Sequence, residues 1–300
     1  MAFTLSNVML HGYRDLGKIA AGDEFVVTSG SNTTTIEDTK VGSRESPHEP
    51  DYGLDYTAFV TRDAAGASAA PENEYQRVSA YDEATYKWTV DTAFSASLAT
   101  GDTVALANKD IPLRTMIELV NRMLKDLGRI DLVDTTLTTA NNQTEYTLPV
   151  TAKYSLKKIE VQGYTGDAND NQYYTLYERM VTPAAPASTG LLTIPQLATG
   201  YTIKLWYEGI HPTLSIYSSV ISETIDEDLA IKGTVYYALK WYNNSIRGQN
   251  DYWYDQMIKA KQEFETQKQI TPVKRVQSVS KFFNMRGSLT EDLPPDPVVP

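Results

Sequence analysis

One loop of the sequence has oxygen-bearing residues at the spacing of a calcium-binding loop. Positions 1, 3, 5 and 12 of that pattern are Asp167, Asn169, Asn171 and Glu178. Position 6, where the sharp turn needs glycine, is Gln172, and the flanking residues have strand-like patterns. We therefore favour a polar hairpin tip over a calcium site. The prediction for the chain is no metal and no cofactor.

The residue types needed for covalent catalysis are scarce. The chain has no cysteine, which excludes disulfides, thiolate metal sites and cysteine nucleophiles. Its three histidines, His11, His48 and His211, show no ligand-pair spacing, and we find no serine-nucleophile, phosphate-loop or dinucleotide motif. The carboxylates at 223–228 fall at a predicted helix start, where the helix dipole accounts for them. We predict that the chain is not an enzyme; a hydrolase with an unrecognised carboxylate pair is the less favoured hypothesis.

Composition points to a structural protein without deciding its partners. Tyrosine is abundant, with 20 residues against 7 phenylalanines, which suits subunit interfaces or simply a β-rich chain. The net charge of −11 disfavours ordinary nucleic-acid binding. It suits either a channel through which DNA slides or plain solubility. No apolar run approaches the ~20 residues of a membrane span, and no secretory signal opens the sequence. We expect a soluble protein made in a cytoplasm.

Four helices are expected from hydrophobic periodicity, over 5–16, 112–127, 224–243 and 250–268. Asp110 is a plausible cap of the second helix, and Thr224 and Glu227 match a capping box for the third. The third helix is apolar on two sides, so we expect it to be buried on two sides.

Short strands are expected over 22–108 and 143–208. The strand Tyr201–Glu208 alternates, with Tyr201, Ile203, Leu205 and Tyr207 on one face. We divide the chain into an N-terminal helix (1–20), a small antiparallel β domain (21–110), a core of helix, β-sheet and helical hairpin (111–270) and an extended C-terminal tail (271–300).

The tail contains spaced apolar residues that have no neighbouring core of their own: Val276, Val279, Phe282, Phe283, Met285 and Leu289. Such a segment can become ordered on a partner surface, and we favour this over a floppy terminus. The tail closes with the proline-rich stretch Leu293–Pro300.

The region Ile111–Lys268 resembles a known family. The helix Leu113–Gly128 leads into Asn142–Pro149 and Leu156–Val161. The strand Gly200–Tyr207 then continues through His211-Pro212 into paired aromatic-rich helices. This order resembles the head–tail adaptor proteins of tailed phages, also called connector, neck or head-completion proteins. The resemblance implies an α+β fold: a helical adaptor-like body with antiparallel β insertions and an extended C-terminal tail.

The resemblance also implies a virion protein at the neck, the head–tail interface. Subunits would form a homo-oligomeric ring, usually a dodecamer, that docks on the portal protein through the tail residues and offers an attachment site for tail proteins. DNA would pass through without specific binding. Within each subunit we expect the interface to include Tyr236, Tyr237, Trp241, Tyr252 and Trp253. The alternative is another tail or baseplate component, or a carbohydrate-binding β module using Tyr52, Tyr56, Tyr86 and Trp88.

Overall fold

The computed structural model describes residues 3–20, 22–28, 32–39, 51–66, 69–149, 156–163, 172–177, 180–182, 190–245 and 251–278. The chain forms two compact units. Unit 1 comprises Met1–Ile130 and Ile210–Lys274, and unit 2 comprises Asp131–Gly209 and Arg275–Pro300. The four segments predicted from sequence stay a prediction, since these units group the residues by contact instead.

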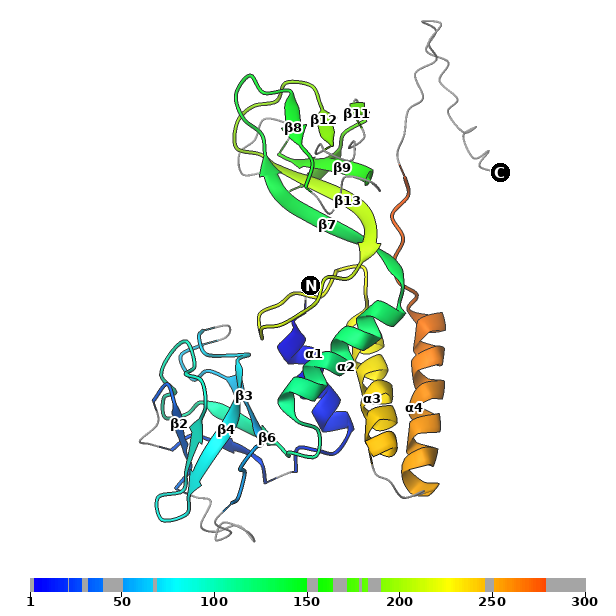
Figure 1. Cartoon of the computed structure of the whole chain (residues 1–300). Coiled ribbons are helices and arrows are strands. Elements are labelled where there is room, and N and C mark those ends of the chain that lie inside the picture. The colour runs from blue at the N-terminus through cyan, green and yellow to red at the C-terminus, as the bar shows by residue number, and fades with distance from the viewer. Residues whose placement is uncertain are drawn as a thin grey trace, which may run out of the picture. The chain divides into compact units, whose positions relative to one another are not determined.

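Unit 1 contains a curled antiparallel sheet, which we call the barrel (Figure 1). Its strands are β1 (Glu24–Val26), β2 (Thr35–Glu37), β3 (Thr57–Arg62), β4 (Tyr75–Asp82), β5 (Lys87–Val90) and β6 (Thr103–Ala107). They lie in the order β1-β6-β3-β4-β5-β2. The backbone N–H of Thr28, just after β1, donates to the carbonyl of Glu37 in β2 at 3.1 Å. The two edge strands therefore meet, which leaves little open sheet edge.

Alternating residues of these strands fill the barrel. In β5, for example, Trp88 and Val90 are buried while Lys87 and Thr89 are half-buried. The inward residues form one core: Phe25, Val27, Ile36, Ala58, Val60, Val78, Trp88, Val90, Phe94, Leu98, Val104 and Leu106. The other face of β3 is covered by α1 (Leu5–Asp15), where Phe59 meets Tyr13 with ring centroids 5.8 Å apart.

The remaining helices of unit 1 are α2 (Leu113–Asp126), α3 (Glu227–Ser245) and α4 (Asp251–Ile270). Helix α3 packs against α1, α2 and α4, which confirms the prediction that it is buried on two sides (Figure 1). Gly233 makes this packing possible. A Cβ atom there would lie 2.6 Å from Met123 Cγ of α2 and 2.7 Å from Phe264 Cε2 of α4.

The helices begin differently from their predicted caps. Asp110 forms an ion pair with Lys18 at 2.6 Å, and Pro112 precedes α2 without a side-chain cap. Thr224 lies before α3, which begins at Glu227, and the Asp226 carboxylate accepts the N–H of Asp228 at 3.1 Å. The capping side chain is therefore that of Asp226, two residues after the predicted Thr224.

Unit 2 consists of two antiparallel sheets. The first has the order β10-β9-β13-β7 and the second β11-β12-β8. Their strands are β7 (Arg129–Thr138), β8 (Glu145–Thr147), β9 (Leu156–Gln162), β10 (Tyr173–Thr175), β11 (Met180–Thr182), β12 (Leu191–Thr193) and β13 (Thr202–Ile210). The predicted alternation in β13 is confirmed, because Ile203, Leu205 and Tyr207 are buried and Lys204 and Trp206 are half-buried.

The predicted fold class is wrong. The described residues contain strands in three sheets and only four helices, so the protein is β-rich and has no helical body with β insertions. The error has an identifiable source. Short strands were expected over 22–108 and 143–208, but the predicted fold class followed the family resemblance, which treats the helices of 11 to 20 residues as the body and the strands as insertions. None of the described helices combines the length and the apolar character needed to cross a bilayer.

Candidate functional site

The five aromatic residues predicted as a subunit interface lie on α3 and α4, in different surroundings. Tyr237 is buried, and its pKa is raised by burial and by the nearby Asp126. Tyr236 is half-buried and stacks on Phe264, with ring centroids 6.1 Å apart. Trp241 is half-buried. Tyr236 and Tyr237 therefore contribute to packing within the subunit, and an interface role for the set stays a prediction.

Trp253, at the start of α4, belongs to a cation cage inside unit 1. The ammonium of Lys18 lies 4.8 Å from the ring centroid of Tyr242 and 5.4 Å from that of Trp253. It also lies 2.6 Å from a carboxylate oxygen of Asp110. Lys18 is only 8% exposed, so its charge interacts with these groups with little solvent screening. The cage links the segment after α1 to the segment before α2 and to the ends of α3 and α4.

The two residues that flank Trp253 are exposed tyrosines. Tyr252 is 59% exposed and Tyr254 is 53% exposed. Successive helical residues are about 100° apart, so these rings project on either side of Trp253, whose own ring packs on Tyr242 at 4.8 Å. Helix α4 thus presents one exposed aromatic ring on each flank. The interface predicted from the sequence included Tyr252 but not Tyr254, although Tyr254 is also aromatic and follows it by two residues.

The start of the predicted portal-binding tail is anchored in unit 2. The backbone N–H of Val276 donates to Asp131 Oδ2 at 2.6 Å, and Lys157 Nζ lies 2.6 Å from Asp131 Oδ1. Asp131 is completely buried, so its carboxylate needs both partners. Val279, Phe282, Phe283, Met285 and Leu289 lie outside the described residues, as do Asp167, Asn169, Asn171 and Glu178 of the calcium-like loop.

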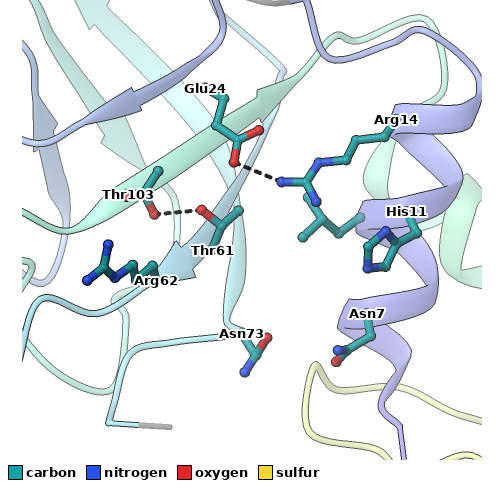
Figure 2. Close-up of a pocket in the computed structure, with 9 residues that line it drawn as sticks. Asn7, His11, Arg14, Glu24, Thr61, Arg62, Asn73 and Thr103 are labelled. Atoms are coloured by element: carbon teal, nitrogen blue, oxygen red, sulfur yellow. Dashed lines mark hydrogen bonds and ion pairs between the residues drawn. The ribbon is translucent and has the colours of Figure 1, made fainter. Parts of the chain in front are cut away.

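A polar pocket of about 370 Å³ lies beside α1 in unit 1. Asn7, His11 and Arg14 line it from one face of the helix, opposite residues of the barrel (Figure 2). Arg14 pairs with Glu24 at 2.8 Å, and Arg62 extends away from α1 (Figure 2). The carboxylate of the pocket is therefore matched by an arginine, and we assign no reaction to it.

His211 serves the structure and not a reaction. Its Nε2 accepts the N–H of Ser222 at 3.1 Å, so the proton of the neutral ring is on Nδ1, which contacts the Pro212 carbonyl at 2.8 Å. Burial lowers the pKa of His211, although the Pro212 contact opposes this. Among the described residues no three His, Cys, Asp or Glu side chains are grouped to hold a metal.

Comparison with known proteins gives no match: no protein-family model fits the chain, and no curated protein is significantly similar to it.

Proposed function

We propose that this chain is a structural subunit of the ring that connects head and tail in a tailed phage. The observation that carries the proposal is the pair of exposed tyrosines, Tyr252 and Tyr254, on the two flanks of α4. A ring needs two different surfaces on each subunit, one for each neighbour. Tyrosine is favoured at such surfaces, because its ring buries apolar area while its hydroxyl tolerates water.

The tail supports the second part of the proposal, docking on a portal protein. Its apolar residues begin at Val276, where the backbone is fixed to the buried Asp131. The residues beyond Ser278 therefore start from a defined point on unit 2, and a partner surface would gain their apolar contacts. The net charge of −11 suits a passage in which DNA phosphates find few binding partners.

The carbohydrate-binding alternative has less support. It relied on exposed aromatic residues in the β domain, and Trp88 is completely buried at the centre of the barrel. Tyr52, Tyr56 and Tyr86 are only partly exposed and pack against that core.

The ring is tested with the portal assembly of the same virus and single variants of the exposed tyrosines. We expect Tyr252→Ser and Tyr254→Ser each to fold normally and each to abolish the ring seen by negative-stain electron microscopy on the portal. Tyr177→Ser is the matched control, because Tyr177 is equally exposed at 53% but lies in unit 2. Rings formed equally by all three variants would refute the proposal.

Tail docking is tested separately by ending the chain after Ser278, which retains the bond between Val276 and Asp131. The shortened protein should keep its melting temperature and lose portal binding in co-sedimentation. Undiminished binding would show that the portal contacts lie elsewhere in the chain.

A further inference from the structure

The polar pocket beside α1 is lined by two different parts of unit 1, the helix and the barrel (Figure 2). On the helix side, Asn7, His11 and Arg14 follow one another at i, i+4 and i+7, so they share one face of α1. The barrel contributes residues of β1, β3 and β6 and of the turn before β4: Glu24, Thr61, Arg62, Thr103 and Asn73. A ligand in this pocket would therefore contact both parts at once.

Several polar groups of the pocket are available to a ligand. Within the described part of the chain, no hydrogen bond is formed by the His11 ring, the Asn73 side-chain amide or the Asn7 amide nitrogen. All three residues are half-buried, so water reaches these groups from one side only. An imidazole and a carboxamide can both donate and accept hydrogen bonds. They suit hydroxyl groups, which also do both.

The backbone already fixes the barrel side of the pocket. Asn73 has a φ of +68°, a conformation that asparagine tolerates, and its N–H donates to the Val60 carbonyl at 2.9 Å. The Thr61 hydroxyl donates to the Thr103 carbonyl at 3.2 Å, which leaves its oxygen free to accept. Groups held in this way lose little entropy when a ligand binds.

The charges of the pocket leave one arginine unmatched. Arg14 and Glu24 neutralise each other in their ion pair at 2.8 Å. Arg62 is exposed at the barrel end, away from α1, and forms no ion pair with any described residue (Figure 2). A register shift between Val60 and Arg62 in the pairing of β3 with β6 interrupts the alternation of side chains there. The pocket of this acidic protein therefore carries a local positive charge, which favours a ligand with a negative group.

Size and wall chemistry limit the class of ligand. The volume of about 370 Å³ is near the lower end of small-molecule pockets, which measure roughly 300–1,000 Å³. Leu10 is the one large apolar residue of the lining, so a lipid chain or a flat aromatic ligand finds little to pack against. The net charge of −11 disfavours a nucleic acid.

We propose that this pocket binds a small hydroxyl-rich molecule with one acidic group, the chemistry of a sugar acid or a sugar phosphate. Its hydroxyl groups bond to His11, Asn73 and the carboxylate of Glu24, and its acidic group lies at the Arg62 end. The pocket shares no residue with the aromatic set considered above for carbohydrate binding. The inference goes beyond the connector function and does not depend on it.

The test uses the full chain and three probes that differ in the acidic group: glucuronate, glucose 6-phosphate and glucose. Two-dimensional NMR follows the side-chain amides of Asn7 and Asn73 and the backbone amides of Thr61 and Thr103. We expect saturable shifts at these positions with an acidic probe, and about fivefold weaker binding of glucose. The stronger of the two acidic probes tells whether the pocket prefers a carboxylate or a phosphate.

Two variants assign the roles of the helix and the barrel. His11→Ala should weaken binding of the acidic probes by about fivefold to tenfold, because it removes a hydrogen-bonding group. Arg62→Gln should abolish the preference for an acidic probe and leave the affinity for glucose unchanged, a pattern that loss of structure would not produce. Arg114→Gln is the matched control, because its side chain is 93% exposed on α2, and it should change neither affinity. Circular dichroism melting checks that all three variants fold.

Three results would overturn the proposal. The first is the absence of saturable shifts with both acidic probes at tens of millimolar concentration. The second is equal affinity for glucose and the acidic probes in the unsubstituted chain. The third is equal behaviour of Arg62→Gln and Arg114→Gln, which would show that the acidic group is not recognised at the barrel end of the pocket.

Discussion

Helices α3 and α4 are neighbours of nearly equal length, but α3 is largely buried and α4 is largely exposed. Helix α3 has 19 residues, and nine of them are buried: Leu229, Ala230, Ile231, Gly233, Thr234, Val235, Tyr237, Ala238 and Leu239. Helix α4 has 20 residues, of which only Ala260 and Phe264 are buried. One helix is part of the core, and the other is held along a single edge. The second has most of its surface left for partners.

The sequences of the two helices explain the difference. Helix α3 carries apolar residues around most of its circumference, together with Gly233, whose missing side chain admits α2 and α4. Helix α4 has one narrow apolar stripe of Trp253, Met257, Ala260 and Phe264, with polar residues over most of the remainder. Tyr252 touches the ring of Trp253 at 5.1 Å, yet Tyr252 and Tyr254 keep more than half of their surface exposed, which is why we assign them to contacts between subunits.

The largest expected effect comes from comparing two aromatic residues of α4. Phe264→Ala removes a ring that is 1% exposed and stacks on Tyr236, so we expect it to lower the free energy of unfolding by about 3–5 kcal/mol. Tyr254→Ala removes a ring that is 53% exposed and should change it by less than about 0.5 kcal/mol. Urea unfolding followed by circular dichroism measures both. Similar losses in the two variants would mean that α4 is not held along one edge only.

A smaller effect is expected from adding a single methyl group to α3. Gly233→Ala would place Cβ within 2.7 Å of both Met123 and Phe264, so α2 and α4 must shift. We expect a loss of about 1–3 kcal/mol in the same assay, after allowing for the better helix propensity of alanine. Gln262→Ala, on the exposed side of α4, is the control and should be close to neutral. An unchanged or raised stability of Gly233→Ala would show that α3 is less tightly enclosed than the contacts indicate.

The helices could be predicted from the sequence more reliably than the strands. All four helices were found within about three residues of their observed bounds, because each carries three or more turns of periodic apolar residues. Strand β7 was missed. Its sequence, Arg-Ile-Asp-Leu-Val-Asp-Thr-Thr-Leu-Thr, does not alternate, because Ile130, Asp131 and Leu132 are buried one after another. The fold class was wrong for another reason: it followed the family resemblance, in which helices form the body, although strands were expected over 22–108 and 143–208.

The candidate site could be predicted only in part, because residue type does not show which neighbours a side chain contacts. The aromatic residues of α3 and α4 could be found from residue type, but their roles depend on which neighbours they meet. Trp253 faces Lys18, a residue more than two hundred positions away in the chain, while Tyr252 and Tyr254 beside it face solvent. The contact of Asp131 with the backbone of Val276 likewise joins distant segments without any motif. Only tertiary structure separates these cases.

The smallest expected effect is a loosening of the first turn of α3 at low pH. Helix α4 should not show it. The turn before α3 depends on neutral His211, because Ser222 donates its N–H to Nε2 and accepts the N–H of Ile225. Burial lowers the pKa of His211 below its ordinary value of 6.5. As pH falls through 6.5, the unfolded chain takes up a proton that the folded chain resists, so this contribution to stability is present above that pH and is lost below it.

Hydrogen exchange between pH 7.5 and 5, corrected for the intrinsic pH dependence of amide exchange, measures this loosening directly. Protection at Ser222 and in the first turn of α3 should decrease below pH 6.5, while protection in α4 should stay constant. His211→Gln removes the titrating ring and retains a hydrogen-bond acceptor, so in this variant the decrease should disappear. If it persists, carboxylates near the start of α3 cause it. If α4 loosens in parallel, the two helices open as one cooperative element, and the contrast between a core helix and a helix held by one edge does not extend to their dynamics.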